Sequence, residues 1–141
     1  MRLFLDTSVL LAGSGSRMGA SREVFRLAPS NAWTLVATPY VIEEVLRNLP
    51  SLPLDASSDW IHLRADLIIQ DDVVTLDRAN VFAAAKDRPI LFSALAWADT
   101  LLTLDRGDLG NLLGGEFYGL PILTPGSFLE RERAAGRLKT P

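Results

Sequence analysis

The stretch that decides the fold is RLFLDTSVLLAG, residues 2–13. It begins with an apolar run over residues 3–5, reaches a single acid at Asp6, passes two hydroxyl residues and returns to apolar residues. The apolar run is typical of a buried strand, and Asp6 then stands where that strand ends. Ligands of open α/β sheets bind at the carboxyl ends of the strands, so an acid in this place is a candidate for chemistry. The structural alternative is that the Asp6 carboxylate caps a helix or a turn, helped by Thr7 and Ser8.

Length and composition indicate a single domain over residues 1–141. Hydrophobic residues make up 48% of the chain and charged residues 22%, values that favour a globular protein over a disordered one. The absence of cysteine excludes disulfides and thiolate chemistry. A net charge of −3 argues against a dedicated nucleic-acid binder, unless several of the acids surround a cation.

The sequence carries no membrane or secretion signal that we recognise. Asp6 interrupts the first apolar run too early for a secretion signal. No stretch approaches the roughly 20 apolar residues of a membrane-spanning helix. We therefore expect a cytoplasmic protein with no membrane partner.

Apolar runs and helix signals alternate along the chain. Strands are predicted over residues 3–5, 33–37, 73–76, 100–104 and 120–123. Helices are predicted over residues 22–28, 39–49, 56–69, 78–85, 90–97 and 127–138. The glycine-rich segments 13–19 and 114–119 are expected to be loops. This alternation predicts a mainly parallel sheet of about five strands, covered by helices on both faces.

Four acids are expected near one edge of this sheet. Asp6 and Asp105 end buried strands, Asp87 precedes a helix, and Glu44 lies on an amphipathic helix. If the two strands are neighbours, their terminal acids lie about 5 Å apart in backbone spacing. Two carboxylates about 4 Å apart repel by about 4 kcal/mol at an effective dielectric constant of about 20. Oxygen ligands without histidine or cysteine suit Mg²⁺ or Mn²⁺, so a divalent cation is the expected solution.

Such a cation stabilises charge on a phosphoryl group and makes a bound water nucleophilic, which predicts hydrolysis of a phosphodiester. The hydroxyls of Ser8 and Thr103, each two residues from a strand-end acid, are candidates to orient a water or a phosphate. Their alternative role is a hydrogen bond to the local backbone. Arg88 and Arg106 adjoin the acidic positions and are the candidates for holding phosphate.

Five segments resemble the motifs of one known family, the PIN-domain nucleases, which include toxins of bacterial toxin–antitoxin pairs. The segments are LDTSVLLAG, TPYVIEEVL, DRPILFSAL, LLTLDRGDL and LPILTPGSFLE, and together they extend over nearly the whole chain. The resemblance implies a three-layer α/β/α Rossmann-like sandwich and a ribonuclease that depends on Mg²⁺ or Mn²⁺. The metal ligands that it implies are Asp6, Glu44, Asp87 and Asp105, with Asp108 as an auxiliary acid.

The resemblance leaves some choices open. Glu43 stands beside Glu44, and we prefer Glu44 because it directly precedes the Val-Leu pair of the family pattern. The implied partners are RNA as substrate, an antitoxin that covers the site, and a second copy of the chain. One alternative is a PIN-like domain that binds RNA or protein without cutting. Another is a phosphatase with Asp6 as nucleophile, which is disfavoured because such enzymes usually carry a second aspartate where Ser8 stands.

Several other conspicuous residues are expected to be structural. His62, the only histidine, is predicted on a helix surface with no partner acid nearby. Asp99 is expected to be a turn or cap residue away from the acidic edge. The tryptophans are expected to pack in the core; they are Trp33, Trp60 and Trp97.

Overall fold

The computed structural model describes residues 1–75, 87–107 and 109–141, and places six strands in one sheet. The strands are β1 (Arg2–Leu5), β2 (Thr34–Ala37), β3 (Leu67–Ile69), β4 (Thr100–Leu102), β5 (Glu116–Phe117) and β6 (Leu120–Leu123). Their order across the sheet is β3-β2-β1-β4-β6-β5, with all neighbours parallel except the antiparallel pair β5 and β6. This confirms the expected mainly parallel sheet.

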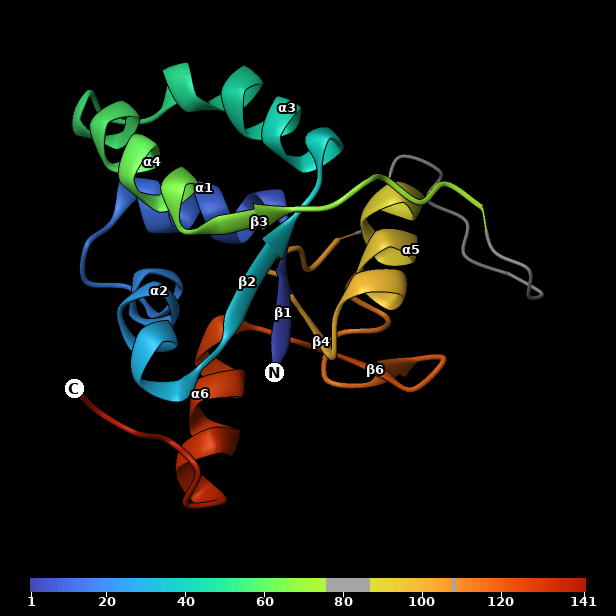
Figure 1. Cartoon of the computed structure of the whole chain (residues 1–141). Coiled ribbons are helices and arrows are strands. Elements are labelled where there is room, and N and C mark those ends of the chain that lie inside the picture. The colour runs from blue at the N-terminus through green and yellow to red at the C-terminus, as the bar shows by residue number, and fades with distance from the viewer. Residues whose placement is uncertain (76–86, 108) are drawn as a thin grey trace.

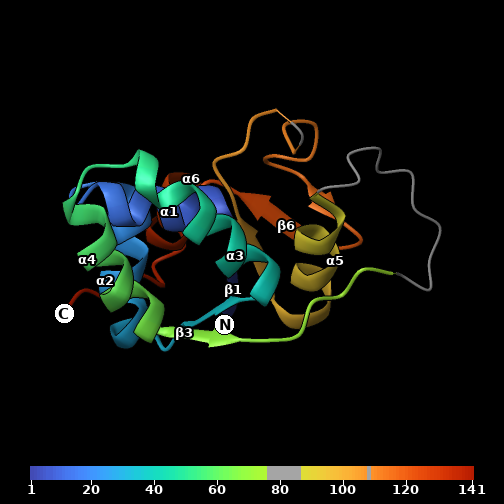
Figure 2. The ribbon, with the colours of Figure 1, turned by 90° about the horizontal axis from the view of Figure 1, so that it is seen from above.

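Helices cover both faces of the sheet. They are α1 (Thr7–Gly15), α2 (Ala20–Asn31), α3 (Pro39–Asn48), α4 (Asp55–Ala65), α5 (Arg88–Trp97) and α6 (Pro125–Ala134), with a 3₁₀ turn η1 at Leu49–Ser51. In both views α1, α2, α4 and α6 lie to one side of β1 and α5 lies to the other (Figures 1 and 2). Helix α3 lies over the strand ends and contacts both α1 and α5. The architecture is therefore the predicted α/β/α sandwich.

Strand β1 is central in this sandwich. The side chains of Leu3, Phe4 and Leu5 are fully buried, as expected for a parallel strand covered on both faces. Strand β1 pairs with β4, with Leu5 opposite Leu102. From β1 the chain connections proceed to β2 and β3 in one direction and to β4 and β6 in the other, so the order reverses between β1 and β4. Ligands of such sheets bind in the crevice at this reversal, outside the carboxyl ends of the strands.

The third strand differs from the prediction. The helix predicted over residues 56–69 ends at Ala65, and its last residues form β3 instead. Residues 73–75, where a strand was predicted, follow an irregular path, and Leu76 lies outside the described residues. The β-branched residues Ile68 and Ile69 favour a strand, which explains why β3 forms here. The helix was predicted because the same residues continue the apolar spacing of α4.

Other boundaries also shift. Helix α1 extends into the predicted loop as far as Gly15, and α2 continues through Pro29 to Asn31. The last helix ends at Ala134 rather than at residue 138. The connection at residues 114–119 contains the short strand β5 and a tight return to β6. The helix predicted over residues 78–85 lies outside the described residues. Within the described ranges no helix has the length and apolarity needed to cross a membrane.

Candidate active site

Asp6 is the single residue between β1 and α1. Its backbone N–H donates to the Leu102 carbonyl of β4, and its side chain is 4% exposed. Oδ1 accepts a hydrogen bond from the Thr7 backbone N–H at 2.7 Å. Oδ2 accepts two more, from the hydroxyls of Ser8 at 3.0 Å and Thr103 at 2.7 Å. Asp6 therefore does cap α1, as the structural alternative held, and it does so at the reversal of strand order where chemistry is expected.

Burial raises the pKa of the Asp6 carboxyl above its ordinary value of 3.8. The hydrogen bonds from Thr103, Ser8 and Thr7 act against this increase because they stabilise the charged form. The negative charge of Glu44 raises the pKa further. The two carboxylates thus interact electrostatically although they come from different elements.

Glu44 reaches the site from α3. Its Oε1 accepts a hydrogen bond from the Thr7 hydroxyl at 3.0 Å, and its side chain is partly buried. Glu43 lies on the solvent side of α3, where its 73% exposed side chain pairs with Arg47 at 3.2 Å. The rotation of about 100° between successive helical residues separates the two acids. Of the two, Glu44 is the one that the fold brings to Asp6.

The β4 side of the site is formed by Thr103 and the loop after it. The Thr103 hydroxyl oxygen, which donates to Asp6, also accepts the backbone N–H of Asp105 at 3.0 Å. Asp105 is partly buried, and its Oδ1 accepts the Gly107 N–H at 2.9 Å. The prediction that Asp105 ends the strand as Asp6 ends β1 was wrong, because β4 stops at Leu102 and Thr103 takes that place. Asp105 follows in the loop.

Ser8 connects the start of α1 with the loop after β4. Its hydroxyl donates to Asp6 and accepts the backbone N–H of Leu104 at 2.9 Å. The turn at the start of α1 is therefore fixed to the loop after β4. Both predicted auxiliary hydroxyls, Ser8 and Thr103, bond to Asp6 rather than only to the local backbone.

Asp87 occupies the position before α5 and is buried. The last residue of this helix, Trp97, accepts a hydrogen bond from Arg2 at the start of β1, so the helix begins toward the carboxyl edge (Figure 1). Arg88, partly buried, is the first residue of α5, and Arg106 is exposed in the loop that holds Asp105. The predicted auxiliary acid Asp108 lies outside the described residues.

The donor set at this edge consists of oxygen atoms. Asp6 and Glu44 are joined through Thr7, and Asp105 is joined to Asp6 through Thr103. In residues 1–75, 87–107 and 109–141 no three acidic, histidine or cysteine side chains gather closely enough to form a ready metal centre. The coupled pair of Asp6 and Glu44 nevertheless has the chemistry of a hard divalent cation site, because carboxylates are the ligands that such ions prefer.

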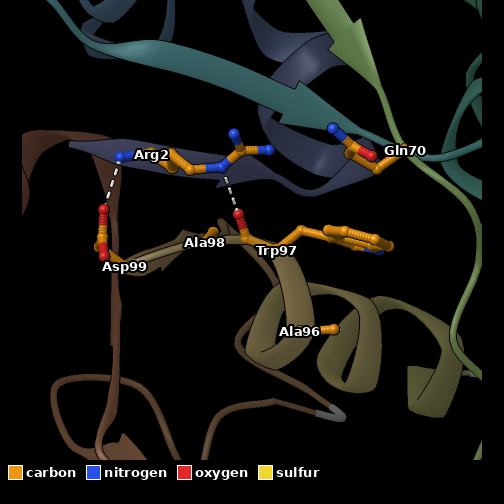
Figure 3. A pocket seen from close by; sticks show the side chains of 6 residues that line it. All are labelled: Arg2, Gln70, Ala96, Trp97, Ala98 and Asp99. Atoms are coloured by element: carbon orange, nitrogen blue, oxygen red, sulfur yellow. Dashed lines mark hydrogen bonds between the residues drawn. The ribbon is translucent and has the colours of Figure 1, made fainter.

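A separate cavity of about 350 Å³ lies between the start of β1, the end of α5 and Gln70, which follows β3 (Figure 3). Asp99 accepts the Arg2 backbone N–H at 2.7 Å there, and the Arg2 side chain donates through Nε to the Trp97 carbonyl at 2.6 Å. Gln70 and Ala96 complete much of the lining. Asp99 thus belongs to the strand starts, away from the acidic edge. None of the predicted metal ligands lines this cavity.

The other conspicuous residues lie where they were expected, with one difference. His62 is exposed on α4, while Trp33 and Trp60 are buried in the core. Trp97 is only partly buried, and its indole N–H donates to the Asp71 carbonyl. The residue that sequence reasoning missed is Thr7, which it treated only as a helper in capping. The available signal was its hydroxyl, directly beside the strand-end acid.

Comparison with known proteins supports the fold. No family model matches the chain, and no curated protein matches it in sequence. The solved structure of VapBC2 from Rickettsia felis, bound to a DNA fragment from their promoter, is similar with a TM-score of 0.60 and 15% identity, over 86% of this chain and 97% of that one. A PilT N-terminus domain protein from Sulfolobus solfataricus P2 is similar with a TM-score of 0.56 and 11% identity, over 100% and 97% of the chains. The chain therefore has the fold of the PilT N-terminus, or PIN, domain, as the motif resemblance implied.

Proposed function

We propose that this protein is a metal-dependent endoribonuclease. The observation that carries the proposal is the pair of interacting carboxylates, Asp6 and Glu44, at the reversal of strand order. Placing a second negative charge near a buried carboxylate is unfavourable unless a proton or a cation compensates the pair. A site that keeps such a pair, at the edge where α/β sheets bind ligands, is suited to a cation that acts on a bound phosphodiester.

The proposed ligands are four acids: Asp6, Glu44, Asp87 and Asp105. Mg²⁺ or Mn²⁺ held there would neutralise charge on the phosphoryl group and make a water more nucleophilic. Asp6 is prepared for this role, since Oδ2 accepts two hydroxyl hydrogen bonds while Oδ1 accepts one in the described part of the chain. Oδ1 is therefore the oxygen with room for a cation.

Other residues have supporting roles in the proposal. Ser8 and Thr103 fix the orientation of the Asp6 carboxylate through their hydrogen bonds to Oδ2. Arg88 and Arg106 would contact phosphates of the substrate, because guanidinium groups bind phosphate oxygens in a bidentate manner. Asp108, two positions after Arg106 in the sequence, would serve as an auxiliary acid.

RNA is the proposed substrate because the five motifs resemble those of the PIN-domain nucleases. The same resemblance suggests a toxin held by an antitoxin, and a homodimer. The Rickettsia felis VapBC2 complex, similar in fold, is consistent with a partner protein. A neighbouring reading frame that encodes a small DNA-binding protein would support the antitoxin.

The test is cleavage of RNA by the purified protein with Mn²⁺ or Mg²⁺, with and without a chelator. We expect cleavage that the chelator abolishes and that Asp6→Asn and Asp105→Asn each reduce by at least about 100-fold. Asp99→Asn is the matched control, because Asp99 lies at the opposite edge of the sheet. Circular dichroism would check that each variant is folded.

Retained cleavage in both Asp6→Asn and Asp105→Asn would exclude the assignment. If calorimetry detects no uptake of Mn²⁺ and no RNA is cut, the domain is instead one that binds RNA or a protein partner without cutting.

A further inference from the structure

Thr7 contacts both acids of the pair. Its backbone N–H donates to Asp6 Oδ1 at 2.7 Å, and its hydroxyl donates to Glu44 Oε1 at 3.0 Å. The residue is buried, and it is the first residue of α1. Among the described residues it is the one that donates hydrogen bonds to the side chains of both Asp6 and Glu44. We propose that Thr7 is a positioning residue that holds Glu44 in place beside Asp6, an inference that rests on the proposed nuclease function.

The backbone at Thr7 is well fixed. Asp6 belongs to the end of β1, with its N–H bonded to the Leu102 carbonyl, and the helix begins immediately afterwards. A β-branched side chain on a helix also has few rotamers available. The backbone that carries the Thr7 hydroxyl is therefore held in place, and the hydroxyl can donate its hydrogen bond in only a few directions.

Glu44 needs such a partner. It lies on α3, partly exposed, with three side-chain torsions that would let it turn toward solvent. The negative charge of Asp6 favours that movement, since like charges repel. The neighbouring Glu43, which extends into solvent and pairs with Arg47, illustrates the alternative position. The Thr7 hydroxyl opposes this movement before any cation is present.

The bond leaves Glu44 able to bind a cation. The Thr7 hydroxyl uses one acceptor position of Oε1, and no other described residue bonds to the Glu44 carboxylate, so its second oxygen, Oε2, has room for other contacts in that part of the chain. Hydrogen bonds that orient metal ligands in this way commonly contribute about 10-fold or more to metal affinity or activity. The effect expected of Thr7 is thus on the position of a ligand rather than on the fold.

The chain offers a closely matched control in Thr38. It is the single residue between β2 and α3, one position before the helix begins, and it is fully buried. In the part of the chain that the structure describes, the Thr38 hydroxyl has no hydrogen-bond partner. Thr38→Val therefore makes the same chemical change as Thr7→Val, at another buried threonine beside the start of a helix, without removing a contact to an acid.

The experiment compares four proteins: wild type, Thr7→Val, Thr7→Ser and Thr38→Val. Calorimetry measures Mn²⁺ affinity, kinetics measure kcat and KM for RNA, and NMR of the apo proteins measures the Glu44 carboxyl carbon shift. Thr7→Val is expected to weaken Mn²⁺ binding about 10-fold, lower kcat and leave KM unchanged. Thr7→Ser, which keeps the hydroxyl, is expected to stay within about threefold of wild type. Thr38→Val is expected to match wild type.

The NMR shift of the Glu44 carboxyl carbon tests this inference independently of the proposed function. It should move in Thr7→Val, return in Thr7→Ser and stay unchanged in Thr38→Val, whether or not the protein cuts RNA. An unchanged shift in Thr7→Val would overturn the inference even if RNA is cut. A shift that moves as expected in a protein that neither binds Mn²⁺ nor cuts RNA would overturn the proposed function alone.

A double variant tests whether Thr7 acts through Glu44. In the Glu44→Gln background Thr7→Val should cause no further loss of kcat, because the ligand that it positions is already disabled. A full additional loss would mean that Thr7 acts on Asp6 or on the fold, which would also overturn the inference. Thermal unfolding of Thr7→Val would identify any general loss of structure. Thr7→Ser keeps the hydroxyl and removes only a methyl group, so it shows the effect of altered packing alone.

Discussion

The Thr103 hydroxyl donates a hydrogen bond to Asp6 Oδ2 at 2.7 Å across two neighbouring strands, between residues 97 positions apart in the sequence. The same oxygen accepts the backbone N–H of Asp105. One hydroxyl therefore fixes the orientation of the buried Asp6 and the start of the loop that carries the partly buried Asp105. Ser8, which bonds to Asp6 and to the Leu104 N–H, makes a second connection between the same two elements.

Thr103→Val should destabilise the protein. The substitution keeps the shape of the side chain but removes a donor to a buried carboxylate and an acceptor for the Asp105 N–H. We expect a loss of about 1–3 kcal/mol in the free energy of unfolding, measured by urea denaturation, because a buried polar group left unpaired costs about that much.

The control is again Thr38→Val, whose hydroxyl has no partner among the described residues. Its free energy of unfolding should stay within about 0.5 kcal/mol of wild type or rise. If both valine variants lose the same stability, the hydrogen bonds of Thr103 are not the cause.

Mn²⁺ should raise the melting temperature of the wild-type protein. A cation bound between Asp6 and Glu44 removes the repulsion between them and binds only the folded chain. At about 100 times the dissociation constant, one bound ion adds about 2.7 kcal/mol to the free energy of unfolding. Thermal unfolding in the presence and absence of MnCl₂ measures the effect.

Two variants test whether the Mn²⁺ effect arises at the proposed site. Asp6→Asn should remove most of the Mn²⁺ effect, whereas Asp99→Asn should keep it because Asp99 lies at the other edge of the sheet. An equal increase in all three proteins would indicate binding elsewhere on the surface.

The ion pairs of Asp59 should make stability depend on pH at acid values. Arg17 and Arg22 hold the pKa of the Asp59 carboxyl at about 2, below its ordinary value of 3.8. A carboxyl whose pKa is lowered by folding stabilises the folded state above its unfolded pKa. That contribution is lost as the pH falls from about 4 to about 2. Melting temperatures of wild type and Asp59→Asn should therefore differ at pH 7 and converge near pH 2.

The two arginines should contribute unequally. Arg22 is 22% exposed and also donates to the Gly13 carbonyl, whereas the Arg17 side chain is 68% exposed. Solvent weakens the exposed pair. Arg22→Met should consequently lower the melting temperature at pH 7 more than Arg17→Met, and the opposite order would contradict this account.

The acidic edge could be predicted because strand ends follow from local patterns. A buried run followed by Asp6, and a second run followed shortly by Asp105, indicated which residues share that edge. That these two strands are neighbours in the sheet was an assumption. The order of the strands confirms it, because β1 lies beside β4. The choice between Glu43 and Glu44 depended on the rotation of α3 about its axis, which packing against α1 and α5 fixes.

Other features could not be read from local patterns. The residues of β3 continue the apolar spacing of α4, so only pairing with β2 distinguishes them as a strand. The position of Asp105 beyond the end of β4 depends on the Thr103 hydroxyl, which accepts its N–H and so begins the loop. The contact from Thr7 to Glu44 joins residues 37 positions apart and exists only because α1 and α3 meet.

The direct junction at Asp6 also limits how this chain can change in length. A residue inserted between Leu5 and Thr7 would either turn the carboxylate to the other face of the sheet or displace the start of α1. Neither change could be absorbed locally, because β1 is central and Asp6 bonds to β4. The connection between β4 and β5 begins with a loop and is anchored at Thr103. Insertions and deletions that alter the substrate range should therefore be tolerated between Gly107 and β5, after the residues bonded to Asp105, and excluded between Leu5 and Thr7.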